Sequence, residues 1–367
     1  MWFRRMALEE WFDEHQYGVT YDVGESAVQY LSFGDLGLDL KGVPLRYGYH
    51  KGNPELRALI AEQHQGIPQD QVVVTNGASE ALFIVAASLL KPGDHVVIEH
   101  PNYPSNYEVP RSLGCKVDLL ELEVASGFRP DPDELRSLIT PSTKLVSLTH
   151  PNNPTGSMIT QDALEDLLQV AESCGCYLLL DETYRELAFD RRLPTAASLS
   201  PRAISISTMS KAYGLPGIRV GWIAAQDTSL IRTCLAVREQ VTICNSAIGE
   251  AIAVSVLRQG SVLLKKVREH VLRNLELVTD WLQLHQELEW VKPEAGVVCF
   301  PRIREGVLPD PEELYRLLVR KYKTFVIPGR CFEVDNRFFR IGYGARFGDV
   351  KSGLENIAAA VAELTQN

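Results

Sequence analysis

A lysine in a loop rich in hydroxyls and glycines is the residue of this sequence most suited to chemistry. Lys211 lies in the run Ser207-Thr-Met-Ser-Lys-Ala-Tyr-Gly-Leu-Pro-Gly-Ile-Arg219, between two apolar segments typical of strands. An amine in such surroundings can form a Schiff base with an aldehyde, next to groups that bind phosphate. An ordinary surface lysine would be out of place among so many glycines and hydroxyls.

A carboxylate that ends a strongly apolar run complements this lysine. Asp181 closes the run Tyr177-Leu-Leu-Leu-Asp181, and Tyr184 follows it as a possible phenolic donor. A carboxylate can keep a pyridine nitrogen protonated, so Lys211 and Asp181 together predict an enzyme that holds pyridoxal phosphate (PLP) and stabilises carbanions. Two alternatives are a helix N-cap and a magnesium site with Glu182. The sequence lacks a nucleotide-type phosphate loop, so we predict no metal site.

Two segments could bind a phosphate. In Thr75-Asn-Gly-Ala-Ser-Glu80 a strand passes into a helix, so the amides of Ala78 and Ser79, just after Gly77, would lie at a helix N-terminus. The lysine loop adds hydroxyls and a guanidinium from Thr208, Ser210 and Arg219. Taken alone, the first segment is equally typical of a helix-capping turn.

Three further candidates follow or close predicted strands. Tyr103, in Pro101-Asn-Tyr-Pro104, could stack on a flat ring. Asn153 lies in a turn-rich segment at 150–156, and Arg340 could clamp a carboxylate. Each has a simpler interpretation as packing, a turn or an ion pair. Their shared place at strand ends, where open α/β sheets bind ligands, favours a single site.

Alternating helices and strands would position these residues. From about residue 53 to 225, apolar strand-like runs alternate with helical segments, which predicts a mainly parallel sheet covered by helices. A long helical region at about 246–285 and a mixed pattern beyond it predict a smaller α+β domain. We expect an N-terminal arm with part of the small domain at 1–45, a large PLP-binding domain at 46–258 and a small domain at 259–367.

Composition excludes several classes of function. The 37 Lys and Arg against 47 Asp and Glu give a net charge of -10, which argues against a nucleic-acid partner. No stretch is long and apolar enough for a membrane span, and the N-terminus lacks a signal region. The seven scattered cysteines form no zinc pattern. We expect a cytoplasmic protein.

The order and spacing of these motifs resemble those of the class I/II aminotransferases, a family of fold-type I PLP enzymes. The matching segments run from about residue 30 to 345, and they are Tyr47 with Gly52-Asn-Pro-Glu-Leu-Arg57, Asn76–Ser79, Pro151–Gly156, Asp181–Tyr184, Ser210–Gly221 and Arg340. Some regulators carry such a domain behind a DNA-binding module. We expect none here, because the motifs begin within some thirty residues of the N-terminus.

The resemblance implies a role for each candidate. Lys211 would hold PLP covalently and move a proton, Asp181 would face the ring nitrogen, and Asn153 and Tyr184 would bind the phenolic oxygen. Tyr103 would stack on the ring, and Arg340 would bind the substrate carboxylate with help from the backbone at Gly34. The phosphate would be held by Gly77, Ala78, Ser79, Thr208, Ser210, Arg219 and, from the other subunit of a homodimer, Tyr47.

The expected reaction moves the α-amino group of an amino acid to a 2-oxo acid. Two departures lie near the presumed substrate end: Ile-Gly-Tyr follows Arg340 where relatives often carry a serine, and Arg330 interrupts the usual Pro-Gly-x-x-Phe loop. Segments at 8–11, 207–222 and 293–301 resemble capreomycidine synthase-like members, which implies β-elimination and cyclisation as an alternative. Arg330, Asn102 and Phe33 are plausible side-chain contacts, and the sequence does not identify the amino acid.

Overall fold

A seven-stranded sheet forms the centre of the larger part of the molecule. The computed structural model describes residues 2–366. The strands of this sheet are β2 (Val72–Thr75), β3 (His95–His100), β4 (Lys116–Glu121), β5 (Thr143–Thr149), β6 (Tyr177–Asp181), β7 (Ala203–Thr208) and β8 (Gly221–Ala225). Their order is β2-β8-β7-β6-β5-β3-β4, and β8 alone runs antiparallel to its neighbours. The predicted fold class, a mainly parallel sheet with a smaller α+β part, is confirmed.

Helices cover both faces of this sheet because its strands are apolar on both faces. Along β3, Val96 and Ile98 pack into one apolar cluster and Val97 into another, as the alternation of a strand requires. The first cluster includes α4 (Ala78–Leu89), α5 (Ser105–Leu113) and α9 (Thr228–Val241). The second includes α6 (Pro132–Leu138), α7 (Gln161–Ser173) and α8 (Ala196–Leu199).

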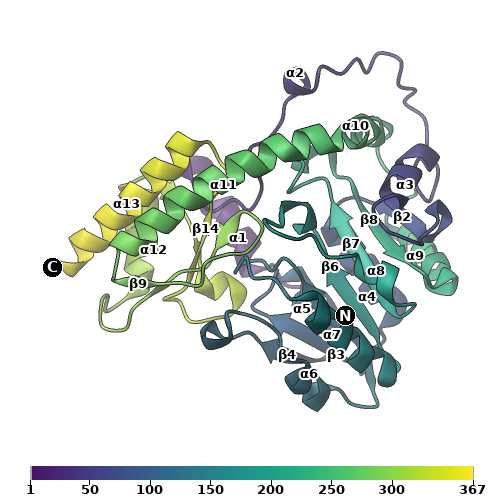
Figure 1. Cartoon of the computed structure of the whole chain (residues 1–367), viewed down its shortest axis with the longest axis horizontal. Coiled ribbons are helices and arrows are strands. Elements are labelled where there is room, and N and C mark those ends of the chain that lie inside the picture. The colour runs from purple at the N-terminus through teal and green to yellow at the C-terminus, as the bar shows by residue number, and fades with distance from the viewer. Residues whose placement is uncertain (1, 367) are drawn as a thin grey trace.

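The C-terminal part is smaller and lies to one side of the large sheet (Figure 1). Its helices are α11 (Gly260–Leu284), α12 (Pro311–Arg320) and α13 (Phe347–Thr365). Its short strands are β9 (Leu288–Glu289), β10 (Val298–Cys299), β11 (Arg302–Ile303), β12 (Thr324–Phe325), β13 (Ile327–Pro328) and β14 (Phe339–Gly342). They pair as β10-β14-β13 and β11-β9.

The N-terminal segment joins the smaller part. Its elements are α1 (Ala7–His15), β1 (Tyr21–Asp22) and α2 (Phe33–Leu36), and α3 (Pro54–Ala61) then leads into the large sheet. Strand β1 pairs in parallel with β12, so residues close to the N-terminus lie next to residues about 300 positions later. The three-part division at 45 and 258 remains a proposal, which this pairing supports.

The long helical region at 246–285 is two helices. Helix α10 (Ala247–Arg258) and α11 meet at Gln259 with a bend of 80°. Within residues 2–366, no single helix is long and apolar enough to cross a membrane; this bent pair meets the length and composition only when its two helices are taken together.

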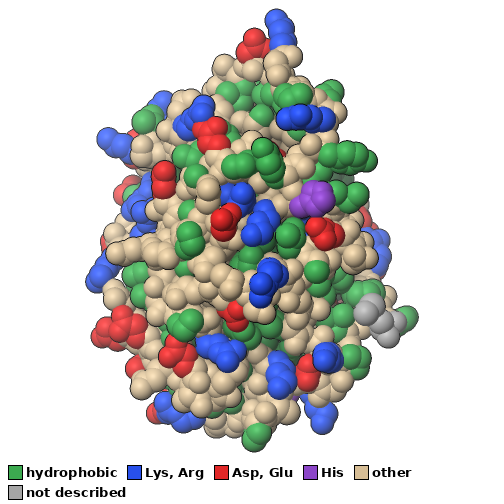
Figure 2. Space-filling model, turned by 90° about the vertical axis from the view of Figure 1, so that its right-hand side faces the viewer, with side chains coloured by type: hydrophobic (Ala, Val, Ile, Leu, Met, Phe, Trp, Pro, Cys, Tyr) green, Lys and Arg blue, Asp and Glu red, His purple; other side chains and the backbone are tan. Residues whose placement is uncertain are grey.

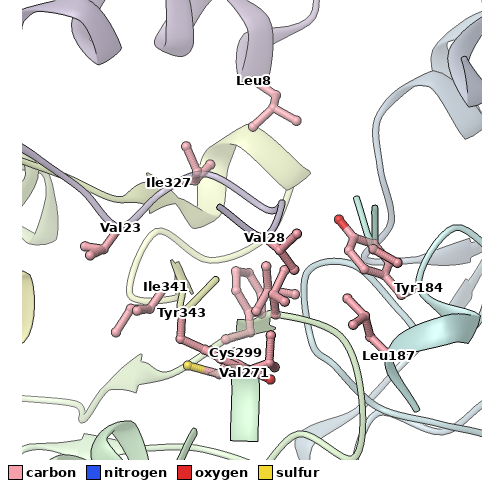
Figure 3. Packing of buried hydrophobic residues seen from close by; sticks show 14 of the residues in the cluster. Leu8, Val23, Val28, Tyr184, Leu187, Val271, Cys299, Ile327, Ile341 and Tyr343 are labelled. Atoms are coloured by element: carbon pink, nitrogen blue, oxygen red, sulfur yellow. The ribbon is translucent and has the colours of Figure 1, made fainter. Parts of the chain in front are cut away.

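One apolar cluster connects the two parts. Figure 3 shows Tyr184 and Leu187, which follow the large sheet, beside Val28 of the N-terminal segment and Ile341 and Tyr343 of the smaller part. All five are nearly or fully buried. The side chains that follow β6 are therefore held between both parts of the molecule.

Charged side chains of both signs share the surface drawn in Figure 2. On that face Lys and Arg side chains are interspersed with Asp, Glu and hydrophobic side chains, and they do not form one continuous basic patch. This distribution fits the excess of acidic residues in the sequence.

Candidate active site

A cavity of about 340 Å³ lies where the large sheet, the N-terminal segment and the smaller part meet. Thr149, Asp181 and Thr208 line it from the carboxyl ends of β5, β6 and β7, which are parallel and therefore end at one edge of the sheet. Eleven predicted site residues line this cavity: Ala78, Ser79, Tyr103, Asn153, Asp181, Tyr184, Thr208, Ser210, Lys211, Arg219 and Arg340.

Lys211 extends from the loop after β7 with its amine at the cavity wall. Its Nζ donates hydrogen bonds to Ser26 Oγ at 3.0 Å and Glu25 Oε1 at 3.2 Å, and its side chain is 25% exposed. Burial lowers the pKa of Lys211, but the charge and hydrogen bond of Glu25 together with Tyr184 outweigh burial, and the pKa lies above its ordinary value. The amine is thus held within the cavity in its charged form.

Asp181 offers one carboxylate oxygen to the cavity. Its Oδ1 accepts hydrogen bonds from the Thr183 amide at 3.0 Å and the Thr183 hydroxyl at 2.5 Å. Its Oδ2 accepts none from the residues that the structure describes, although Asp181 is only 5% exposed. Burial raises the pKa of Asp181 to about 6. A cationic ring nitrogen would compensate this burial, because an opposite charge favours the carboxylate.

Glu182, the residue after Asp181, has a structural role away from the cavity. Its Oε1 accepts hydrogen bonds from the Ala196 amide at 2.7 Å and Ser205 Oγ at 3.1 Å, and the residue does not line the cavity. The alternative of a magnesium site shared by Asp181 and Glu182 is therefore not supported. Across residues 2–366, no group of three or more His, Cys, Asp and Glu side chains is arranged to hold a metal ion.

Arg340 is a fully buried cation at the substrate end. Its Nη1 donates to Asn153 Oδ1 at 2.9 Å and its Nη2 to the Gly24 carbonyl at 2.6 Å. Its buried Nε has no hydrogen-bond partner in the part of the chain that the structure describes, and the residue is 1% exposed. A buried donor without a partner is costly, so this guanidinium is suited to an anionic ligand. The Asn153 amide nitrogen makes no hydrogen bond within 2–366 and can donate to a ligand.

The two predicted tyrosines contact the N-terminal segment. The Tyr184 hydroxyl donates to the Ser26 carbonyl at 2.9 Å, and the Tyr103 hydroxyl donates to Glu9 Oε1 at 3.0 Å. For Tyr184 this differs from the expected bond to a phenolic oxygen, since its proton is used within the chain. Burial, with the charge of Glu9, raises the pKa of Tyr103, so its hydroxyl stays protonated.

The predicted phosphate site is assembled around Gly77. Helix α4 begins at Ala78, so its first amides point toward the cavity. Thr208 and Ser210 lie across from it with their hydroxyls 2.9 Å apart, and Arg219 reaches to within 3.5 Å of Ser210 Oγ. Gly77 has φ 83°, and a Cβ there would lie 2.4 Å from Arg219 Nη2. The glycine therefore lets the guanidinium lie against the helix start.

The structure does not place Gly34 at this cavity, and its predicted role stays a prediction. Gly34 belongs to α2, a short surface helix with a capping box between Ser32 and Asp35, and does not line the cavity. The backbone that reaches Arg340 is Gly24, ten residues earlier. The pairing of β1 with β12 fixes residues 21–22 and delivers the following residues into the site. Tyr47 also lies outside this cavity, as a residue that serves another subunit would.

Three suggested side-chain contacts lie elsewhere. Arg330 pairs with Glu312 at 2.9 Å and stacks on Trp11. Asn102 is fully buried behind the site, where its Oδ1 accepts a hydrogen bond from Thr149 Oγ1 at 2.7 Å. Phe33 is exposed on α2. None of the three lines the cavity, so they are excluded as direct contacts there.

Sequence reasoning missed Glu25, Ser26 and Glu9. They lie near the N-terminus, far in sequence from every strand-end motif, and neither spacing nor composition marks them. Their role depends on the distant pairing of β1 with β12.

The unusual Gly342 accommodates this N-terminal segment. A Cβ at Gly342 would lie 1.9 Å from the Glu25 carbonyl oxygen. We expect Gly342→Ala to displace Glu25 and Ser26 from the Lys211 amine and to lower kcat/KM by about 5- to 150-fold, the equivalent of about 1–3 kcal/mol of overpacking. Steady-state kinetics would measure this. Gly348→Ala is the control, since nothing lies within 4 Å of its added Cβ. Equal kinetics of the two variants would contradict this contact.

Comparison with known proteins agrees with this geometry. The model of the family "Aminotransferase class I and II" matches residues 27–357. The chain belongs to the class I and II aminotransferase family. It is 31% identical to capreomycidine synthase of Streptomyces vinaceus, over 96% of this chain and 92% of that protein.

Two solved structures are similar over nearly their whole length. A PLP-dependent aminotransferase from Streptococcus suis 89-1591 has a TM-score of 0.94 at 29% identity, covering 99% of both chains. The PLP-dependent cyclase OrfR has a TM-score of 0.91 at 29% identity, covering 99% of this chain and 98% of the other. The family and these neighbours are PLP-dependent, so PLP is the cofactor.

The cavity residues fit this cofactor. Asp181 Oδ2 and the Asn153 amide nitrogen are unpartnered within the described chain, and the hydroxyls and amides around Gly77 form an anion site. The Lys211 amine lies at the wall of the same cavity. Each chemical group that PLP presents therefore has a matching residue. The assignment of individual residues remains a prediction, which the variants below test.

Proposed function

We propose that this protein is a PLP-dependent aminotransferase that moves the α-amino group of an amino acid to a 2-oxo acid. The observation that carries the proposal is the convergence of Lys211, Asp181 and Arg340 on one cavity. The similarity to an aminotransferase over 99% of the chain supports it. PLP supplies an aldehyde that combines with amines and a ring that accepts electrons from the amino-acid Cα.

Residues of the chain would bind the substrate, transfer its proton and hold the cofactor. Arg340 binds the substrate α-carboxylate and so orients the Cα–H bond toward the Lys211 amine. The Lys211 amine, in its neutral form, accepts that proton and returns it on the same side of the site. Asp181 keeps a negative charge opposite the ring nitrogen, and the α4 N-terminus with Arg219 holds the phosphate in place.

The first half-reaction, without a 2-oxo acid, distinguishes transamination from β-elimination or cyclisation. A transaminase given an amino acid without a 2-oxo acid should release one equivalent of keto acid per site and then stop, with the cofactor left in its amine form. Absorbance of the purified holoenzyme and product analysis would show this. Continued release of ammonia or of a cyclic product without an added 2-oxo acid would contradict transamination.

A β-eliminating or cyclising activity is the second candidate. One similar protein is named a cyclase, and it and a capreomycidine synthase align over nearly the whole chain. Glu25 also holds the Lys211 amine, 3.2 Å away, in its protonated form. Elimination at Cβ needs a group that protonates the departing oxygen, and this ammonium could do so.

We also propose that the active unit is a homodimer. Apolar side chains are exposed around the loop before α3 and the start of α10, with Leu45 80% and Tyr47 81% exposed. Val241, Ile243 and Ile248 extend this surface. Such a concentration of exposed apolar groups is typical of an interface. Analytical ultracentrifugation would measure the mass, and a monomer at working concentration would contradict the proposal. The cytoplasmic location stays a prediction.

Tyr47→Phe tests whether this tyrosine serves the partner's phosphate site. Loss of one hydrogen bond to a charged phosphate should weaken PLP binding by about tenfold, without unfolding the protein. Titration of the apoenzyme with PLP would measure the affinity. Tyr49→Phe is the control, because Tyr49 is also exposed on this loop and has no proposed role. Equal affinities for the two variants would remove Tyr47 from the site.

A further inference from the structure

More acidic than basic side chains line the cavity, and transamination alone does not explain this excess of negative charge. The cations that line it are Lys211, Arg219 and Arg340, and the anions are Glu9, Asp13, Glu25 and Asp181. Under the proposed function, Arg219 meets the phosphate, Arg340 the substrate carboxylate and Asp181 the ring nitrogen. No cation of the described cavity lining is then left for a substrate side-chain carboxylate, whereas three carboxylates remain.

Glu25 lies beside the reacting atoms. Its Oε1 is 3.2 Å from Lys211 Nζ, and the residue lines the cavity, so it lies next to the amine that would take the substrate proton. Burial favours the neutral form, but the positive charges of Lys211 and Arg340 outweigh it and lower the pKa of Glu25 to about 2. A hydrogen bond from Tyr30 also lowers the pKa of Glu25. Burial raises the pKa of Tyr30 itself, so its hydroxyl stays neutral. Glu25 is therefore an anion throughout the neutral range.

Glu9 lies on α1 and also lines the cavity. Its Oε1 accepts a hydrogen bond from the Tyr103 hydroxyl at 3.0 Å, and among residues 2–366 no Lys, Arg or His forms an ion pair with it. Asp13, one turn further along α1, differs because it pairs with Arg5 and is largely exposed. Glu9 is thus a half-buried carboxylate with no cation of its own.

Arg340 independently marks this cavity as a ligand site. The guanidinium is 1% exposed, lines the cavity and keeps a buried Nε without a partner. This end of the cavity suits the carboxylate that every α-amino acid carries. The cavity therefore combines one anion-binding end with a wall that carries unpaired negative charge.

We propose that the substrate is an amino acid whose side chain carries a positive charge, and that Glu25 and Glu9 recognise this charge. The inference rests on the proposed function and adds the substrate class to it. A guanidinium or ammonium group would supply the cation that Glu9 lacks and a second cationic partner for Glu25, which pairs with Lys211. An anionic side chain would be repelled by both, which gives selectivity by exclusion as well as by attraction.

Matched pairs of amino acids test the charge without changing the shape. The holoenzyme is titrated with L-arginine and its uncharged isostere L-citrulline, with L-lysine and L-norleucine, and with L-aspartate, while the cofactor absorbance reports binding. We expect each cation to bind at least about tenfold more tightly than its neutral partner, because a hydrogen bond to a charged group is worth that much. Aspartate should bind most weakly.

Two variants test which carboxylates cause the preference for a charged side chain. Glu25→Gln and Glu9→Gln should each reduce the preference for arginine over citrulline by about tenfold, chiefly through weaker arginine binding. Glu10→Gln is the control, since Glu10 lies on the same helix, is exposed and does not line the cavity. It should keep the native preference. Thermal melting of all three variants would show that they remain folded.

The outcomes separate the two proposals. If the cofactor spectrum responds to amino acids but neutral partners bind as tightly as cations, or aspartate binds most tightly, the inference is overturned and the proposed function stands. If both Gln variants keep the native preference for arginine, Glu25 and Glu9 are not the recognising groups and the inference also fails. If none of the amino acids alters the spectrum, the proposed function fails and the inference falls with it.

Discussion

Lys211→Ala is expected to lower kcat by at least about 10⁴-fold, the upper range for a positioned acid–base group, while the chain stays folded. Among residues 2–366, Lys211 Nζ makes hydrogen bonds only to Glu25 and Ser26, so its removal leaves the sheet and the core intact. Its loss removes both the attachment point of PLP and the base beside the substrate Cα. Steady-state kinetics with circular dichroism would measure activity and folding together.

Activity should depend on a reactive amine at residue 211 and not only on a positive charge there. Lys211→Arg keeps a cation beside Glu25 but offers no amine that can form the covalent bond, so it should be as inactive as the alanine variant. Arginine in place of lysine thus serves as the matched control for electrostatics. If Lys211→Ala retained native kcat, the proposed role of this residue would have to be abandoned.

Asp181→Asn is expected to lower kcat by about 10²–10³-fold, comparable to the loss of one preorganised electrostatic partner in other enzymes. Asparagine has the shape of aspartate and can keep the contacts with Thr183, but it cannot hold a cationic ring nitrogen. Electron withdrawal by the ring would weaken, so proton removal from Cα would slow. Single-turnover kinetics, which isolate chemistry from product release, would measure the effect.

The same carboxylate predicts a pH dependence of cofactor affinity. Burial raises the pKa of Asp181 to about 6, and only the ionised form can oppose a protonated ring nitrogen. Below pH 6 the carboxylate must first lose a proton, so PLP affinity should fall by up to about tenfold per pH unit. The phosphate of PLP titrates in a similar pH range, so the same titration of Asp181→Asn serves as the control for the phosphate. Identical pH profiles for the two proteins would contradict the assignment.

The strands and helices of the large domain were predictable because their signals are local. Strand β2 (Val72–Thr75), for example, is an apolar run between turn formers, the kind of signal from which the alternation of strands and helices was predicted. The bend at Gln259 was not predicted, because apolar periodicity continues through it. The helices α5 and α9 were also missed. Helix α5 contains Pro110 and buried polar residues, which hide an amphipathic pattern.

The candidate site was predictable only where its residues follow strands of one sheet. Asp181 and Lys211 come from neighbouring strand ends, and a parallel sheet brings such ends together. Glu25 reaches Lys211 across 186 positions through the pairing of β1 with β12 and the contact with Gly342. No local pattern encodes that packing. This is why the N-terminal wall of the cavity, which carries the proposed specificity, was missed.

Locating the cofactor attachment tests the central claim most directly. The purified holoenzyme would be treated with borohydride, which fixes the cofactor to its amine, digested and analysed by peptide mass spectrometry. The pyridoxyl mass should lie on the peptide that contains Lys211, and Lys211→Arg should lose it. A pyridoxyl mass on another lysine, or none after reconstitution with PLP, would contradict the account.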